Sequence, residues 1–167
     1  MLQLRSGEKM NTTNKVDLYT LCLIKDGDSV LLINRPSNRG FPGYIGPGGK
    51  VEPYESISEG AIREVYEETG LIVKNLIYKG ITEWIDIKNN DRSIVFNYLA
   101  TEFEGELLEN PPEGEILWVP IKEALNLPMQ PWFKERLPLF FKEGTFEIFS
   151  EWDPEEGITT KHHVKNL

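Results

Sequence analysis

The sequence predicts a single α+β domain. Segments with strand-like apolar patterns are joined by turn sequences, and one long helix with recognisable signals at both ends lies between them. A chain of 167 residues with 40% apolar residues has the material for one core and is short for two full domains. We expect a flexible tail over residues 1–14 and one domain over residues 15–167.

A hairpin is expected to open the domain. Apolar residues between Val16 and Ile24 and the run from Val30 to Ile33 flank the turn sequence Lys-Asp-Gly-Asp at residues 25–28. Residues 35–49 then contain five glycines, a density that predicts an irregular loop with a functional role.

The clearest helix is expected over Ile57 to Thr69. Ser56 is a plausible N-cap, and Glu59 three residues later completes a capping-box sequence. Gly70 is a suitable C-cap because glycine adopts the left-handed conformation that ends many helices.

The remainder of the chain alternates strands with short helices. Strands are predicted at residues 71–79, 80–87, 93–101 and 116–119, helices at 121–125 and 132–142, and a closing hairpin at 145–152 and 158–164. In the later helix, Leu137, Phe140 and Phe141 form the apolar face. Residues 102–115 are expected to form an acidic loop rich in proline and glycine.

The charge balance argues against a polymeric nucleic acid partner. The chain has 18 Lys and Arg against 27 Asp and Glu, for a net charge of −9. Proteins that hold nucleic acid by its phosphates present a broad basic face, which this composition does not provide.

The single cysteine, Cys22, excludes a disulfide framework and fits a reducing cytoplasm. Residues 1–15 are polar and have no apolar run of signal-peptide length, and no other stretch approaches the length of a membrane span. We therefore expect a cytoplasmic protein without a membrane partner. The sequence leaves open whether it is a monomer or a homodimer.

Three glutamates share one face of the long helix. Glu64, Glu67 and Glu68 are spaced i, i+3 and i+4, next to the apolar stripe of the helix. Carboxylates at this spacing repel one another, and a divalent cation would relieve that repulsion. Oxygen ligands of this kind suit Mg²⁺ or Mn²⁺, which can bridge carboxylates to phosphate oxygens.

Such a run of glutamates is also common on a solvated helix face. The neighbouring residues favour a site. Arg63 could pair with Glu55 or Glu59 and hold the preceding loop against the helix. The sequence Gly-Pro-Gly-Gly at residues 46–49 lets the backbone approach a ligand or a metal ion closely.

The segment from Gly49 to Leu71 resembles the Nudix box, Gly-x5-Glu-x7-Arg-Glu-(apolar)-x-Glu-Glu-x-Gly-(apolar), over 23 residues. All nine defining positions are occupied as the pattern requires: Gly49, Glu55, Arg63, Glu64, Val65, Glu67, Glu68, Gly70 and Leu71. A weaker similarity to MutT-type members, which cleave oxidised purine nucleoside triphosphates, extends over YTLCLI, VLLINR, GYIGPGGKVE and LWVPIKEALNLP.

This resemblance implies a Nudix-type α/β/α sandwich with a mixed, mostly antiparallel β-sheet. It also implies hydrolysis of a nucleoside diphosphate linked to another group, with Mg²⁺ or Mn²⁺ as cofactor. By the same resemblance, Gly49 through its carbonyl, Glu64, Glu67 and Glu68 bind metal, and Glu64 is a candidate general base. Glu55 and Arg63 support the site. Glu113, or alternatively Glu115, is the candidate acid from outside the box.

Substrate contacts are expected from basic and aromatic residues near the box. Arg35, Arg39 and Lys50 are the candidates for phosphate binding, with Lys50 favoured because it directly follows the glycines. A purine needs a flat apolar slot, and the aromatic candidates for it are Phe41, Tyr44, Trp84, Trp132 and Phe133, of which Trp132 and Phe133 are preferred. The chain has Ile45, Trp132 and Phe133 where the mammalian-type sanitising enzymes have polar or acidic residues, so the identity of the base stays open.

The leading functional hypothesis is a Mg²⁺-dependent nucleoside triphosphate diphosphatase of the 8-oxo-dGTP type, acting on a small nucleotide. A Nudix hydrolase of a dinucleoside polyphosphate, a nucleotide sugar or an RNA 5′ end is the first alternative. A non-catalytic Nudix module that only binds a nucleotide is the second, although such modules usually lose the box glutamates that this chain retains.

Overall fold

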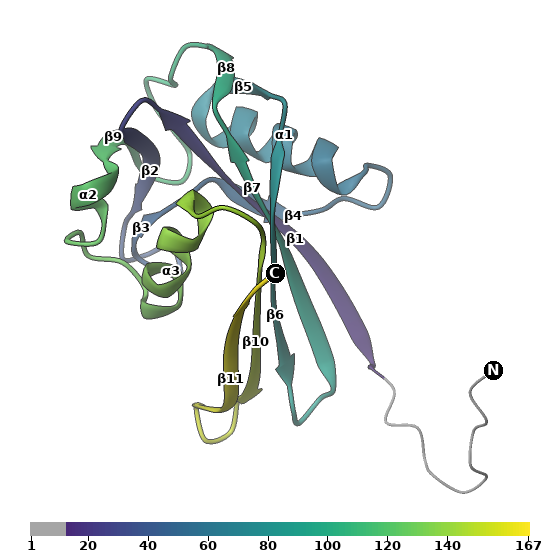
Figure 1. The fold of residues 1–167 in the computed structure, drawn as a ribbon. Helices are drawn as coiled ribbons and strands as arrows, with labels where there is room; N and C mark the ends of the chain where they lie inside the picture. The colour runs from purple at the N-terminus through teal and green to yellow at the C-terminus, as the bar shows by residue number, and fades with distance from the viewer. Residues whose placement is uncertain (1–12) are drawn as a thin grey trace, which may run out of the picture.

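A computed structural model describes residues 13–167 as a mixed β-sheet with helices packed on its two faces (Figure 1). The strands are β1 (Lys15–Asp26), β2 (Ser29–Arg35), β3 (Gly43–Ile45), β4 (Gly48–Lys50), β5 (Leu71–Lys74), β6 (Ile77–Asp86), β7 (Asp91–Ala100), β8 (Glu102–Gly105), β9 (Glu115–Pro120), β10 (Phe146–Asp153) and β11 (Ile158–Asn166). The helices are α1 (Ile57–Thr69), α2 (Ile121–Ala124), α3 (Pro131–Arg136) and the 3-10 helix η1 (Leu137–Phe141).

In the described residues, nine strands form the main sheet, in the order β11-β10-β6-β7-β1-β2-β3, with β4 paired to β1 and β9 paired to β2. The β1–β7 and β6–β10 pairs are parallel, and the other pairs of this sheet are antiparallel. Strands β5 and β8 form a small separate sheet. The α+β class and the mixed, mostly antiparallel sheet are thus confirmed.

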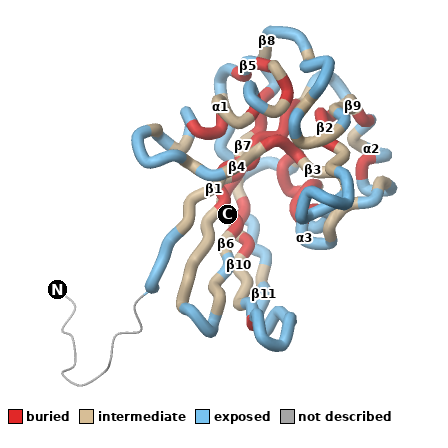
Figure 2. The backbone as a smooth tube through the Cα atoms, turned by 180° about the vertical axis from the view of Figure 1, so that it is seen from behind, coloured by how far each residue is buried: buried red, intermediate tan, exposed pale blue. Residues whose placement is uncertain are grey.

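The sandwich arises because β1 and β2 are buried on both faces. Leu21, Leu23 and the alternate residues of β2 pack against α3 and η1 in one core cluster. Cys22, Ile24 and Leu31 pack against Ala61 and Val65 of α1 in a second. Continuous apolar runs are what a strand covered on both sides requires. Figure 2 shows the buried residues gathered where the strands pass between the helices, whereas the far ends of β1, β6, β7 and β11 are half-buried or exposed.

The closing helix is shorter than the sequence analysis predicts. The expected helix over 132–142 is wrong in its second half, because α3 ends at Arg136 and the chain continues as η1. Pro138 lies in the second position of η1, where a continuing α-helix would need its missing N–H and would meet its ring.

Two further expectations are corrected. The strand predicted over 71–79 ends at Lys74, because Asn75 has the left-handed backbone conformation with φ 50°. The loop predicted over 102–115 begins with β8, whose Glu102 and Glu104 bond Asn75 and Lys74.

The tail expected over residues 1–14 lies outside the described residues except for Thr13 and Asn14, and the Asn14 backbone N–H bonds the Asn90 carbonyl at 3.0 Å. Within residues 13–167, no helix is long and apolar enough to cross a bilayer.

Candidate active site

Helix α1 begins and ends where its sequence predicts, which fixes the rotation of its acidic stripe. The Ser56 side chain accepts from the Glu59 backbone N–H, and the Glu59 carboxylate accepts from the Ser56 N–H at 2.7 Å. Gly70 ends the helix in the left-handed conformation. Ala61 and Val65 are buried against the sheet, so the adjoining glutamates face the glycine-rich strand β4.

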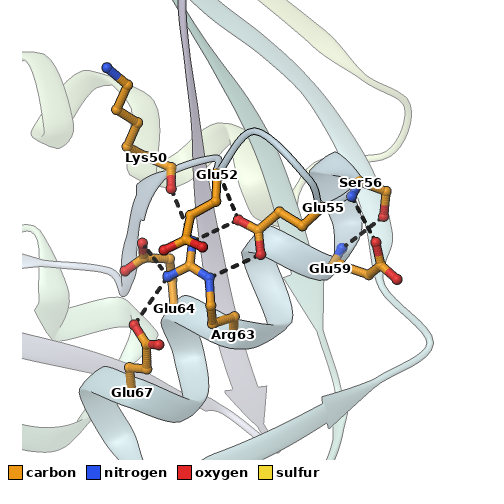
Figure 3. A network of polar contacts seen from close by, with 8 residues as sticks. All are labelled: Lys50, Glu52, Glu55, Ser56, Glu59, Arg63, Glu64 and Glu67. Atoms are coloured by element: carbon orange, nitrogen blue, oxygen red, sulfur yellow. Dashed lines mark hydrogen bonds and ion pairs between the residues drawn. The ribbon is translucent and has the colours of Figure 1, made fainter.

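Arg63 is the centre of the polar network drawn in Figure 3. Its guanidinium donates two bonds to the carboxylate of Glu55, at 2.7 and 3.0 Å, in the fork geometry that strengthens such pairs. It also donates to Glu64 at 2.9 Å, to Glu67 at 3.0 Å and to the backbone carbonyl of Lys50 at 3.0 Å. The Arg63 guanidinium therefore connects the loop before α1, the end of β4 and two glutamates of the helix.

The pairing with Arg63 has a clear electrostatic result at Glu55. Hydrogen bonds from the guanidinium, supported by a bond from the Glu52 backbone N–H, lower the pKa of Glu55 to about 2. Glu55 is therefore charged throughout the physiological range and acts as a fixed anchor. The expected pairing of Arg63 with Glu55 is present, while Glu59 is engaged by the N-cap.

Glu64 lies directly against Gly49. A Cβ atom at Gly49 would stand 2.4 Å from the Glu64 carboxyl carbon, closer than any real contact. Only glycine therefore lets the carboxylate reach the β4 backbone. Burial raises the pKa of Glu64, and the neighbouring Arg63 opposes this effect. A half-buried carboxylate with a raised pKa is a better proton acceptor than an exposed one.

Glu68 is the most buried of the three carboxylates in the stripe. Its Oε2 accepts from the Gly48 backbone N–H at 2.9 Å. Desolvation is the main cause that raises its pKa to about 8, and the negative charges of Glu64 and Glu113 add to it. Glu67 is different, because its side chain is 55% exposed and reaches only Arg63.

Glu113 lies in the loop before β9, near the acidic stripe. Its carboxylate bonds Arg35 at 3.2 Å, and the charges of both residues act on Glu68. Arg39 reaches the same loop by donating to the Pro112 carbonyl at 3.0 Å. The structure thus brings two of the predicted phosphate-binding residues and the predicted outer acid to one border of the site. Glu115 is exposed at the start of β9.

Lys50 is placed at the end of β4 with its side chain turned away from the Arg63 network (Figure 3). Its Nζ atom bonds Asp17 at 2.6 Å, and the side chain is largely exposed. Nothing in the sequence pattern singled out Asp17 as its partner, because the pairing of β1 with β4 joins residues 33 positions apart.

The aromatic candidates separate into two groups. Phe41 is exposed and meets Trp132 edge to face, with ring centroids 5.8 Å apart. Trp132 is 37% exposed. Phe133 is fully buried in the core and contacts the Trp132 ring from within, at 6.2 Å. Phe41 and Trp132 therefore lie at the protein surface, and Phe133 packs against Trp132 from the core.

The donor set fits a hard divalent cation. It offers the carboxylates of Glu64, Glu67 and Glu68 beside the β4 backbone, which Gly49 leaves accessible. A nearby positive charge would stabilise the ionised form of the buried Glu68 carboxylate most strongly. Within residues 13–167, no group of three or more His, Cys, Asp or Glu side chains is positioned to hold a metal ion. The reason lies in the network, since Arg63 holds Glu64 and Glu67 while the Gly48 N–H holds Glu68.

Comparison with known proteins connects this geometry to a family. The model of the family described as NUDIX domain matches residues 17–140 of this chain. The crystal structure of the mutator MutT protein from Bacillus halodurans is similar with a TM-score of 0.77 and 33% sequence identity, over 89% of this chain and 97% of that one.

Two proteins of Bacillus subtilis (strain 168) are similar in sequence. The one named uncharacterized Nudix hydrolase YvcI is 32% identical over 155 residues, which cover 87% of this chain and 96% of that protein. The one named putative 8-oxo-dGTP diphosphatase YtkD is 63% identical over 38 residues, which cover 23% of this chain and 24% of that protein.

Proposed function

Because this chain belongs to the NUDIX domain family, we propose that it is a Mg²⁺-dependent hydrolase of nucleoside triphosphates that releases a monophosphate and pyrophosphate. Oxidised purine deoxynucleotides such as 8-oxo-dGTP are the first substrates to consider, and the printed name of YtkD supports this choice. The family acts on small nucleotides with divalent metal ions, which fits the acidic stripe and the net charge of −9. The reaction takes place in the cytoplasm in this proposal.

The observation that carries the proposal is the arrangement around Arg63. Its guanidinium fixes the loop through Glu55 and the strand through the Lys50 carbonyl, and presents Glu64 and Glu67 on the same side. Glu68 is held beside them by Gly48. An intact, interlocked set of box residues is what a catalytic member needs.

Each residue has a role in the proposed reaction. Glu64 accepts a proton from the attacking water as the general base. Water then forms a bond to phosphorus, and the bond to the pyrophosphate leaving group breaks. Gly49, Glu64, Glu67, Glu68 and Glu113 would hold a divalent cation, which when bound neutralises triphosphate charge and acidifies water. Glu55 and Arg63 position these groups.

Basic and aromatic residues complete the proposed substrate site. Arg35, Arg39 and Lys50 bind phosphate oxygens after exchanging their present protein partners. Phe41 and Trp132 contact the base, with Phe133 behind them.

The test is a hydrolysis screen. Purified protein with Mg²⁺ is incubated with standard and oxidised nucleoside triphosphates, a dinucleoside polyphosphate, a nucleotide sugar and a capped oligonucleotide, and the phosphate products are identified. We expect pyrophosphate from the triphosphates. Intact triphosphates alongside cleavage of another substrate would refute the triphosphatase proposal, and tight binding without any product would favour the non-catalytic alternative.

A matched pair of variants tests the acidic stripe. Glu67→Gln is expected to remain folded and to lose most of its turnover. Glu59→Gln makes the same change on the same helix outside the stripe, and glutamine still serves the capping box. The control should therefore keep its activity, and equal losses in both variants would contradict the assignment of Glu67.

A further inference from the structure

Thr20, in the middle of β1, carries a buried hydroxyl without a hydrogen-bond partner. The residue is 3% exposed, and its Oγ1 atom bonds no group of residues 13–167. Burying a hydroxyl in this way is unfavourable, so buried polar groups are normally bonded. A valine would fill a similar volume in this apolar strand without that penalty. The hydroxyl of Thr20 therefore needs an explanation other than packing.

Thr20 faces helix α1, on the side of the sheet that carries the candidate active site. Side chains alternate along a strand, so Thr20 lies on the same side as Cys22. Cys22 belongs to the core cluster that contains Ala61 and Val65 of α1. Leu21 points to the opposite side, toward α3 and η1. The hydroxyl is therefore on the same face of the sheet as the acidic stripe.

Strand pairing brings Thr20 next to the residue that touches Glu64. Thr20 is directly opposite Gly49 in the pairing of β1 with β4. Opposite residues of an antiparallel pair have their Cβ positions about 4.5–5.5 Å apart on one side of the sheet. A Cβ atom at Gly49 would stand 2.4 Å from Glu64 Oε1 and 2.6 Å from Oε2. The Glu64 carboxylate therefore lies above Gly49, with Thr20 as its neighbour on the adjacent strand.

Glu64 has an oxygen to match the unused hydroxyl. Its Oε1 atom accepts from Arg63 at 2.9 Å, and no bond from residues 13–167 reaches Oε2. A carboxylate accepts up to about four hydrogen bonds, and a threonine hydroxyl has one proton to donate. On its other side Thr20 is opposite Phe96 of β7, whose side chain accepts no ordinary hydrogen bond. Glu64 is therefore the acceptor that the packing offers to Thr20.

We propose that Thr20 is a positioning residue for Glu64: its hydroxyl donates to the Glu64 carboxylate and fixes the direction in which that carboxylate meets the attacking water. This inference rests on the proposed hydrolysis, in which Glu64 is the general base. Rotation about χ1 moves the hydroxyl between staggered positions, so the bond can form without a change in the backbone. Arg63 holds one oxygen of Glu64, and a bond from Thr20 to the other fixes the carboxylate plane. A general base works only within hydrogen-bond reach of the proton it takes, so its orientation affects the rate.

Two substitutions at position 20 separate the hydroxyl from the packing. Thr20→Val removes the hydroxyl and nearly keeps the volume, whereas Thr20→Ser keeps the hydroxyl and removes a methyl group. With a nucleoside triphosphate and Mg²⁺, Thr20→Val should lower kcat by about 5-fold to 100-fold, the upper value being that of a catalytic group misplaced by about 1 Å. KM should change by less than about 2-fold, because Thr20 does not touch the substrate. Thr20→Ser should keep most of the wild-type kcat, and an unchanged kcat in Thr20→Val would overturn the inference.

Thermal unfolding distinguishes positioning from a role in the core. Removing an unpaired buried hydroxyl should leave the thermal midpoint of Thr20→Val level or raise it. Thr20→Ser should lower the midpoint, because the lost methyl group leaves a small cavity. Activity and stability therefore rank the two variants in opposite order if the hydroxyl acts on Glu64. A kcat that follows the midpoint in both variants would show that Thr20 only supports the fold, and would refute the inference.

Thr82→Val is the matched control. Thr82 on β6 is 6% exposed, and its Oγ1 accepts from the Asn97 amide at 3.2 Å. It is opposite Val95, which belongs to the core cluster on the α3 side of the sheet. The same substitution at this position should lower the thermal midpoint and leave kcat unchanged. A loss of kcat equal to that of Thr20→Val would count against a specific action on Glu64.

A double-mutant cycle connects the effect to Glu64. Because Thr20 acts through this carboxylate, Thr20→Val should have no further effect on kcat once Glu64→Gln has removed the base. Losses that multiply in the double variant would give Thr20 an independent role and refute the proposal.

The two proposals fail in different ways. If the wild type cleaves no nucleotide of the hydrolysis screen, the proposed function is wrong, and the inference about Thr20 falls with it. If the wild type cleaves a substrate other than a triphosphate, the triphosphatase proposal fails, and the same comparison of variants on that substrate decides the role of Thr20. If triphosphates are hydrolysed equally well by the wild type and Thr20→Val, the function stands and only the role of Thr20 is refuted.

Discussion

Gly49→Ala separates the catalytic geometry of this site from its stability. The new Cβ atom would lie 2.4 Å from the Glu64 carboxyl carbon, and ordinary van der Waals contact begins at 3.4 Å. The carboxylate therefore has to withdraw by about 1 Å. A misplacement of that size in a catalytic group can reduce the rate by about 100-fold.

The stability of this variant should change little. Glu64 ends in a flexible side chain that can move, and an added methyl group restricts the unfolded chain, which by itself stabilises by about 0.4–1 kcal/mol. The net change in the free energy of unfolding should remain within about 1 kcal/mol, or a few degrees in the thermal midpoint.

Gly48→Ala is the contrasting variant. Its Cβ would stand 2.2 Å from the Thr20 carbonyl oxygen and 2.9 Å from the Leu21 Cα, and these backbone atoms cannot withdraw without breaking the pairing of β1 with β4. Overpacking of this kind costs about 1–3 kcal/mol. Both variants are assayed for kcat/KM and for thermal unfolding. Full activity in Gly49→Ala, or a loss matched by the same drop in midpoint as in Gly48→Ala, would refute the reasoning.

Three further predictions concern charge and packing. Arg63 lowers the pKa of Glu55 to about 2 from the ordinary value of 4.5, so this pair stabilises the fold fully above pH 4.5 and loses its effect as the pH falls toward 2. The difference in thermal midpoint between wild type and Glu55→Gln should shrink over that window, and a constant difference would contradict the pairing. Burial raises the pKa of Glu68 to about 8, so between pH 4.5 and 8 the folded metal-free protein holds a proton that the unfolded chain has released. The free energy of unfolding should therefore fall as the pH rises through this range. Urea unfolding in EDTA should show this fall in the wild type and a smaller one in Glu68→Gln. Phe133→Ala should lower the free energy of unfolding in urea by about 3–5 kcal/mol, because the Phe133 ring is fully buried. Trp132→Ala should lower it clearly less, because Trp132 is partly exposed. Equal losses in the two variants would place Trp132 in the core.

Local signals in the sequence were enough to predict α1 and the core of the candidate site. Ser56, Glu59 and Gly70 act within one turn of the helix ends, so their capping can be read directly from residue types and spacing. The same spacing places Glu64, Glu67 and Glu68 on one face, whatever the rest of the chain does. The sequence offers Glu55 or Glu59 as partners for Arg63, and the pair forms with Glu55, which lies eight positions earlier, just before the N-cap.

Features that depend on distant pairing were not predicted. Strands β4 and β8 are short and polar, and they exist only because β1 and β5 offer free edges to them. The parallel neighbours β1 and β7 are 76 positions apart at their first pair, Lys15 and Asp91, and no local pattern specifies this register.

Arg136 shows the same limit for the burial of a charged residue. On a surface helix an arginine is normally solvated, and only the packing of α3 over β7 reveals that this one is buried and unpaired.

The basic residues around the site are already engaged, which bears on how an acidic protein would bind the proposed triphosphate substrate. Arg35 is bonded to Glu113, Arg39 to the Pro112 carbonyl and Lys50 to Asp17. A triphosphate has to displace these partners and also approach the carboxylates of the stripe, so its affinity without a divalent cation should be low.

Mg²⁺ should change this balance, because carboxylates that bind the cation no longer repel phosphate oxygens. We therefore expect calorimetric titration with a nucleoside triphosphate analogue to give at least about 10-fold tighter binding in Mg²⁺ than in EDTA, a difference of 1.4 kcal/mol. Glu67→Gln removes one proposed metal ligand and should narrow that difference, while Glu59→Gln should preserve it. Equal affinity in EDTA and Mg²⁺ would mean that the basic residues alone hold the phosphates, and the acidic stripe would then have no part in binding.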